Sequence, residues 1–178
     1  EVFGLNVLGL IYIKKEEFLN AIKVFEKAIS INPEYTDSFN NLGKCYIDLE
    51  KLNLAYLYFK KAYKINPNSD LPLMNIANIL SLKDKNKLAI KFYKKVKQIN
   101  PKNKQADENI IICNIRLKKF DWVEKEVVNS EKLRDTNYDL ILGYSYLLLN
   151  KKKFKKGFDL FDARFNTNDF PKTNKYHF

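Results

Sequence analysis

The stretch LGKCYIDLEKLNLAYLYFKKAYKINP, residues 42–67, recurs along the chain with a period of 34 residues. Its closing proline, Pro67, is preceded by Pro33 and followed by Pro101, and its Leu-Gly pair also stands at residues 8–9. A period of this length indicates a repeat architecture, in which one supersecondary unit is stacked several times. The sequence therefore predicts a row of similar units, each burying its apolar face on its neighbours, and no single central core.

Each period contains two stripes of apolar residues at helical spacing. In the first period Leu5, Leu8 and Tyr12 fall at i, i+3 and i+7, and Phe18 begins a second stripe. The segment between the stripes is so short that the two helices must form an antiparallel hairpin, and Pro33 ends the second helix. The spacing predicts helices over residues 3–14, 17–31, 36–48, 52–65, 70–82, 86–99, 104–117, 120–132 and 154–165.

The marker residues form the pattern L-G-x-x-Y, A-x-x-x-F-x-x-A and a closing proline, which residues 8–33 and 42–67 both carry. The pattern resembles the tetratricopeptide repeat, and the resemblance covers nearly the whole chain. It implies an all-α fold, a right-handed α-α superhelix (TPR solenoid) of about five helical hairpins. The expected repeats are residues 2–35, 36–69, 70–103, 104–135 and 136–165, the last two divergent, followed by an extended tail or linker at 166–178.

Two details of the repeats are predicted from the small residues. Gly9 is expected to face Ala21 and Ala28 and so to let the two helices of the first hairpin approach closely. In the fifth repeat the Leu142-Gly143-x-x-Tyr146 pattern comes two residues early, although the second helix keeps the 34-residue register. We therefore expect a longer turn at residues 150–153.

The net charge of +11 comes from lysine, because only three of the 32 basic residues are arginine. The chain is equally rich in Asn, Ile, Phe and Tyr, a mixture typical of a genome biased toward A and T codons. Nucleic-acid sites favour arginine and place aromatic residues among the cations. We therefore interpret Lys60, Lys61, Lys64, Lys91, Lys94, Lys95 and Lys97 as a solvated outer face. The alternative is binding of nucleic acid or an acidic surface through this lysine-rich convex face.

No stretch approaches the roughly 18 apolar residues that a membrane span needs. Cys45 and Cys113 lie two periods apart, so helix packing at roughly 10 Å should keep them beyond the roughly 7 Å Cα limit for a disulfide. We expect two buried thiols in a reducing compartment, and hence a soluble, cytoplasmic protein. Because the chain starts at Glu1 and enters its first repeat almost at once, we also expect it to be part of a longer protein.

Residues for catalysis or metal binding are not grouped in this sequence. The single histidine, His177, has no neighbouring cysteine or second histidine, so it supports neither a metal site nor a Cys–His or Ser–His pair. The five glycines form no phosphate-binding loop. The sequence predicts a chain that is itself no enzyme and needs no cofactor or metal.

The remaining candidate site is the concave surface formed by the first helices of the repeats. One position there holds asparagine in three successive repeats, at Asn41, Asn75 and Asn109. Asparagine both donates and accepts hydrogen bonds, so such a row is suited to bind the main chain of an extended peptide or a partner helix. A chain this rich in asparagine also produces such matches by composition. The other predicted contacts are Lys44, Asn78 and Arg116, with Leu10, Ile47, Met74, Leu82 and Ile112 as apolar neighbours.

Two relatives of this pattern carry different expectations. The row at Asn41, Asn75 and Asn109 resembles the asparagine ladder of the tetratricopeptide superhelix in O-linked N-acetylglucosamine transferase, which implies main-chain binding. Chaperone-binding members of the family use a carboxylate clamp, which adds lysine and arginine at set places in the first helices. Here those places hold Asp37, Gln105 and Asn109, so the cations are missing and the clamp is disfavoured.

The C-terminal part suggests two further alternatives. Residues 154–165 resemble the F-x-x-G-W-x-x-Y-E-x-R-W segment that closes the repeat array before a glycosyltransferase-type domain in large bacterial proteins. This resemblance implies a substrate-recruiting arm of a longer bacterial glycosyltransferase. Homo-oligomerisation through repeat ends that lack a capping unit is the other alternative.

Overall fold

Residues 1–128 and 138–163, which the computed structural model describes, form ten α-helices and no β-strand. They divide into two compact units, residues 1–103 and residues from 104 onward. The first contains α1 (Val2–Lys14), α2 (Phe18–Ile31), α3 (Thr36–Asp48), α4 (Leu52–Ile65), α5 (Asp70–Leu82) and α6 (Asn86–Ile99). The second contains α7 (Lys104–Arg116), α8 (Phe120–Val128), α9 (Tyr138–Asn150) and α10 (Phe154–Ala163).

The helices keep the 34-residue period throughout. First helices begin at residues 2, 36, 70, 104 and 138, and second helices begin at residues 18, 52, 86, 120 and 154. The predicted all-α fold of helical hairpins is confirmed, with most helix ends within a residue of their predicted places. The predicted tail at 166–178 and the predicted helical residues 129–132, 164 and 165 lie outside the described part of the chain.

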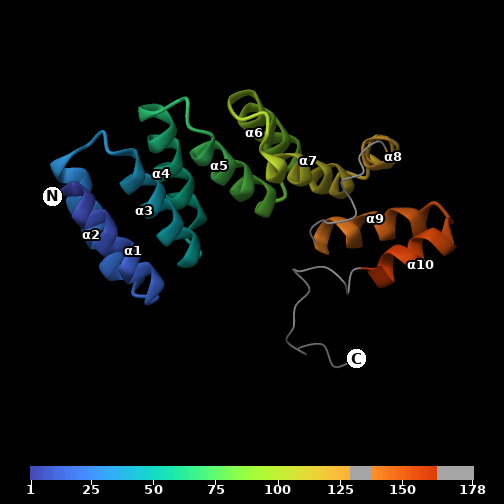
Figure 1. Ribbon diagram of the computed structural model, residues 1–178, viewed down its shortest axis with the longest axis horizontal. Coiled ribbons are helices and arrows are strands. Elements are labelled where there is room, and N and C mark those ends of the chain that lie inside the picture. Colours follow the sequence, from blue (N-terminus) through green and yellow to red (C-terminus); the bar gives the residue numbers. More distant parts are fainter. Residues whose placement is uncertain (129–137, 164–178) are drawn as a thin grey trace. The chain divides into compact units, whose positions relative to one another are not determined.

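In the first unit α2 and α4 each pack both on their own first helix and on the first helix of the next repeat. Thus α2 contacts α1 and α3, and α4 contacts α3 and α5 (Figure 1). The core between them contains Ala21, Ile22, Phe25, Leu42 and Cys45. In the second unit α9 packs on α10 and on α7, and α7 also packs on α8. Packing only between neighbours is what a repeat fold requires.

The close approach of the two helices in a hairpin depends on glycine. A Cβ atom at Gly9 would lie 2.4 Å from the Phe25 ring, and one at Gly43 would lie 2.6 Å from the Phe59 ring. The three heavy atoms nearest to a Cβ at Gly9 all belong to the Phe25 ring, so this ring covers the glycine, and the predicted contact with Ala21 and Ala28 stays a prediction. A real Cβ essentially never approaches a neighbour so closely, so no larger residue fits without movement.

Every turn within a hairpin has the same geometry, although no glycine stands there. One residue in each turn takes a left-handed conformation with φ between 56° and 60°: Glu16, Glu50, Asp84, Lys118 and Lys152. The following amide donates to a carbonyl five residues earlier, as from Lys51 N to Tyr46 O at 2.7 Å. This is the Schellman cap, which ends a helix and satisfies its last carbonyl groups.

The expected longer turn of the fifth repeat is wrong. Lys153 N donates to Leu148 O at 2.9 Å, so the turn has the same three residues as the others. The buried residues Tyr144, Ser145 and Leu148 occupy the Leu, Gly and Tyr positions of the repeat. Gly143 instead faces α7, where an added Cβ would lie 3.0 Å from Ile115 Cδ1. The Leu-Gly-x-x-Tyr motif thus stands two residues early, whereas α9 itself keeps the 34-residue register.

Within the described ranges, none of the helices combines the length and the apolar character that crossing a bilayer would require.

Candidate functional site

The predicted binding residues fall on first helices, as expected, but they belong to both units. We call the predicted positions on α1, α3 and α5 the first-helix face. This face consists of Leu10, Asn41, Lys44, Ile47, Met74, Asn75, Asn78 and Leu82. The remaining three, Asn109, Ile112 and Arg116, lie on α7 in the second unit, where the first two are half-buried and Arg116 is exposed. Within the first unit, the candidate site is the first-helix face.

Asn41 is mostly buried, with 8% of its surface exposed, and its side chain joins two repeats. Its Nδ2 donates to Asn6 Oδ1 at 3.3 Å. Asn6 Nδ2 in turn donates to Ser38 Oγ at 2.7 Å and to the carbonyl oxygen of Val2 at 3.2 Å. These bonds connect α1 to α3. Sequence reasoning missed Asn6, although Asn6 and Asn40 share one register position beside the predicted row.

The same pair of positions one repeat later is not hydrogen-bonded. Asn40 is the register equivalent of Asn6, and Asn75 is the equivalent of Asn41. Asn40 Oδ1 and Asn75 Nδ2 are both buried and have no hydrogen-bond partner. One is an acceptor and the other a donor, so they are complementary. A buried amide group without a hydrogen-bond partner lowers stability. A ligand that supplied the missing hydrogen bonds at this pair would therefore bind favourably.

Three predicted contacts are wholly or partly engaged inside the first unit. Tyr93 of α6 donates its hydroxyl to Asn78 Oδ1 at 2.8 Å. Met74 is buried in the core, and Ile47 is half-buried. A ligand could reach these side chains only in part, so they serve mainly to hold α5 and α3 in place.

The accessible part of the first-helix face is apolar with one cation. Leu10 and Leu82 are 47% and 66% exposed, and Lys44 is also exposed. Exposed apolar side chains also stand at neighbouring positions: Phe3, Val7 and Leu71. Grouped apolar side chains of this kind mark interaction surfaces more often than single ones do.

The lysines of the predicted outer face are exposed on α4 and α6, apart from Lys97, which is half-buried. Two of them lie over aromatic rings of their own helices. Lys61 Nζ lies 5.1 Å from the centre of the Tyr58 ring, and Lys95 Nζ lies 5.6 Å from that of Phe92. These cation–π contacts hold the lysine side chains along the helix surface.

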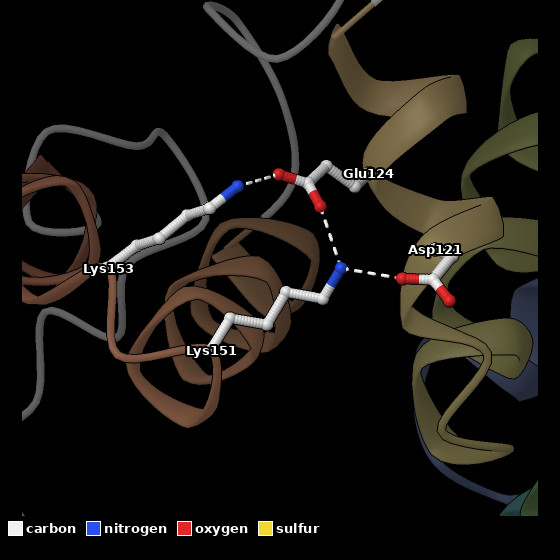
Figure 2. Close-up of polar contacts among 4 residues, drawn as sticks. All are labelled: Asp121, Glu124, Lys151 and Lys153. Atoms are coloured by element: carbon white, nitrogen blue, oxygen red, sulfur yellow. Dashed lines mark hydrogen bonds and ion pairs between the residues drawn. The ribbon is translucent and has the colours of Figure 1, made fainter.

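The second unit contains a compact cluster of charges at one end of its hairpins (Figure 2). Lys151 Nζ lies 2.7 Å from both Asp121 Oδ1 and Glu124 Oε2, and Lys153 pairs with Glu124 Oε1. Hydrogen bonds from Lys151 and Lys153 lower the pKa of Glu124 to about 2. The same bonds raise the pKa of Lys151. Because these four side chains pair with one another, the cluster connects α8 to the turn after α9.

Both cysteines are buried thiols, as predicted. Burial raises the pKa of the Cys45 thiol to about 11, so it is protonated and unreactive at neutral pH. Among the described residues, His, Cys, Asp and Glu side chains are nowhere gathered in threes so as to hold a metal ion.

A row of antiparallel helical hairpins with a 34-residue period defines a protein of the helical-repeat class. The family pattern described as TPR repeat matches residues 9–49, and the pattern described as tetratricopeptide repeat matches residues 36–69 and 72–103. Together these matches cover more than half of the chain. The chain belongs to the tetratricopeptide repeat family.

Solved structures share the fold at low sequence identity. YrrB, described as a TPR protein with an unusual peptide-binding site, has a TM-score of 0.71 and 14% identity over 93% of this chain and 86% of its own. Pseudomonas aeruginosa pilF has a TM-score of 0.78 and 18% identity over 93% of this chain and 75% of its own. The first TPR of Spaghetti (RPAP3), bound to the HSP90 peptide SRMEEVD, has a TM-score of 0.63 and 20% identity over 66% of this chain and 94% of its own. No curated protein sequence matches the chain.

Proposed function

We propose that the chain is a non-catalytic protein-interaction module that binds an extended peptide or a partner helix along the first-helix face. The observation that supports this most is the exposure of Leu10 and Leu82 beside the polar side chains of Lys44 and Asn75. A surface that offers apolar contacts with a few placed polar groups suits a peptide, whose side chains and main chain need both. Structural neighbours that bind peptides, YrrB and Spaghetti among them, support the same class of function.

The asparagines have different parts in this proposal. Asn75 has a buried amide nitrogen without a partner, so it would donate to a peptide carbonyl after a small rotation of its side chain. Asn41 already binds Asn6, and it would act by holding α3 against α1. Within the first-helix face we therefore assign main-chain binding to Asn75 and a positioning part to Asn41.

The test is selection from an unbiased peptide library followed by affinity measurement at low and high salt. The variant Leu10→Ser/Leu82→Ser should bind the selected peptides at least about tenfold more weakly, because each buried leucine contributes about 1.5–3 kcal/mol. The matched control is Leu19→Ser/Leu57→Ser, which removes exposed leucines from the second helices α2 and α4. Equal loss in both variants, or no loss in either, would remove the first-helix face as the binding surface.

The lysine-rich outer face supports one alternative, binding of nucleic acid or an acidic surface. Exposure of six of the seven lysines on α4 and α6 favours it. That alternative predicts binding that weakens steeply as salt rises, whereas apolar peptide binding changes little. Binding that disappears at high salt and survives Leu10→Ser/Leu82→Ser would therefore move the function to the outer face. The glycosyltransferase-arm alternative stays a prediction about sequence that follows the repeats.

A further inference from the structure

Two second helices of the first unit, α4 and α6, carry positive charge only. Together they contain eight lysines and no aspartate or glutamate, although the whole chain has 21 acidic residues. The first helices of the same repeats, α3 and α5, each have one more acidic residue than basic ones. A codon bias toward lysine would raise the lysine content of every helix, but it would not remove the acidic residues from two of them. The charge of α4 and α6 is therefore a local property of this surface.

The lysines occupy the same exposed side of both helices. Lys60 and Lys61 of α4 correspond to Lys94 and Lys95 of α6, one period later, and all four are exposed. Lys61 and Lys95 lie over aromatic rings of their own helices. Within residues 1–128 and 138–163 no ion pair involves five of the other exposed or equivalent lysines: Lys60, Lys64, Lys87, Lys91 and Lys94. Their positive charge is therefore not neutralised by a carboxylate of the described chain.

Exposed leucines accompany these lysines. Leu54 and Leu88 are register equivalents near the starts of α4 and α6 and are 40% and 39% exposed, and Leu57 is 44% exposed. We call the exposed lysines of α4 and α6, together with these three leucines, the lysine–leucine face. The face combines a one-signed charge with apolar side chains that are free to contact a partner.

The composition of this face distinguishes between the classes of anionic partner. Nucleic-acid sites favour arginine and accessible aromatic rings, whereas α4 and α6 contain no arginine, and their Tyr58 and Phe92 rings are half-buried beneath lysines. Protein interfaces are depleted in lysine. Anionic lipid surfaces attract clusters of lysine without a fixed bonding geometry, and neighbouring leucines enter the boundary between headgroups and acyl chains. The observations therefore favour a lipid surface.

We propose that the lysine–leucine face binds the surface of an anionic phospholipid bilayer. The lysines contact the headgroup phosphates and carboxylates, and Leu54, Leu57 and Leu88 enter the boundary beneath the headgroups. This face is formed by second helices, whereas the first-helix face is formed by α1, α3 and α5. The two surfaces are therefore separate, and lipid binding does not depend on the proposed binding of a peptide.

Flotation of the chain with lipid vesicles tests the proposal. At low salt the chain should bind vesicles of phosphatidylcholine that contain about one third phosphatidylserine, and it should not bind vesicles of phosphatidylcholine alone. Binding should weaken as salt rises, because the solution then screens the lysines from the headgroups. Equal binding to the two kinds of vesicle, or binding to neither at low salt, would overturn the proposal.

Substitution of lysines locates the binding surface. Lys60→Gln/Lys91→Gln/Lys94→Gln should lower the partition coefficient about a hundredfold, since one lysine near an anionic surface contributes about a factor of five. The matched control, which removes the same charge from exposed positions outside α4 and α6, is Lys14→Gln/Lys118→Gln/Lys125→Gln. The control should bind vesicles like the unaltered chain. Equal losses in both variants would mean that net charge alone drives binding, and the face would lose its assignment.

Substitution of leucines separates lipid from nucleic acid. Leu54→Ser/Leu88→Ser should weaken vesicle binding about tenfold, because it removes apolar contacts with the bilayer. Leu10→Ser/Leu82→Ser should leave vesicle binding unchanged, so failure of the peptide-binding proposal would not alter this result. A single-stranded oligonucleotide that displaces the chain from vesicles, combined with no effect of Leu54→Ser/Leu88→Ser, would make the face a nucleic-acid site and overturn the proposal.

Discussion

Asn41 Nδ2 donates a hydrogen bond to Asn6 Oδ1 at 3.3 Å, and this contact joins the first helices of two successive repeats. In the same register one repeat later, Asn40 Oδ1 and Asn75 Nδ2 are buried without partners. Two equivalent pairs of asparagines are therefore in two different states. The first pair stabilises the fold, and the second has polar atoms that a bound main chain could satisfy.

This difference predicts unequal costs of substitution. Asn41→Ala leaves the buried Asn6 oxygen without its donor and should lower the free energy of unfolding by about 1–3 kcal/mol. Asn75→Ala removes a donor that has no partner and should cost less than about 1 kcal/mol. Urea unfolding of both variants provides the comparison. Equal costs would show that the two pairs are in the same state in solution.

Glycine at position 43 should tolerate no side chain. Gly43→Ala places a Cβ 2.6 Å from the Phe59 ring, and such overpacking should destabilise the chain by about 1–3 kcal/mol. Gly4→Ala is the matched control, because a Cβ at Gly4 meets no atom within 4 Å. The control should instead gain up to about 1 kcal/mol from the higher helix propensity of alanine. Thermal unfolding that ranks the two substitutions the other way would contradict the packing of Gly43.

Glycine should be favourable in the turns where it is absent. Glu50 has φ of 57°, a conformation that is strained for residues with a Cβ. Glu50→Gly should therefore stabilise the chain by a few tenths to about 1 kcal/mol, part of the relief being offset by the greater freedom of glycine in the unfolded chain. Lys60→Gly, on the exposed side of α4, should instead cost about 1 kcal/mol. Chemical denaturation of the two variants measures whether each substitution raises or lowers the free energy of unfolding.

The charge cluster of the second unit predicts a dependence of stability on pH. Because the pKa of Glu124 is lowered from 4.5 to about 2 on folding, Glu124 contributes stability that is complete above about pH 4.5. This contribution is lost as the pH falls toward 2. Glu124→Gln should lower the melting temperature at pH 7, and the difference should vanish near pH 2.

The control for this pH experiment is Glu126→Gln, which changes another exposed carboxylate on α8. Salt should shrink the Glu124 effect, since the side chains of Lys151 and Glu124 are partly exposed to solvent. A Glu124→Gln difference that grows as the pH falls would contradict the assigned ion pairs.

The sequence predicted the helices well because their ends are set by local chemistry. Pro33, Pro67 and Pro101 end the second helices, and the apolar spacing defines each buried stripe. The prediction for the fifth repeat was wrong because it aligned Leu142-Gly143 with the Leu-Gly pair of the other repeats. The turn at Lys152 and the burial of Ser145 define the actual register, and both depend on tertiary packing that a letter pattern does not contain.

The candidate site could be predicted only in part. The sequence predicted contacts on the first helices, and Leu10, Lys44 and Leu82 are exposed there. It did not indicate that Asn41 is held by Asn6, because that bond depends on the exact approach of α1 and α3. It also missed Phe3, whose exposure depends on what packs against the first helix.

The most direct test of the proposed binding face is an NMR titration of the chain with the tightest peptide from the library. Methyl signals of Leu10, Met74 and Leu82 and the side-chain amide signal of Asn75 report on the first-helix face. The account predicts that the signals of Leu10, Leu82 and Asn75 shift with the affinity of binding, while those of Leu57 on α4 do not. Shifts confined to α4 and α6, with the first-helix signals unchanged, would contradict it.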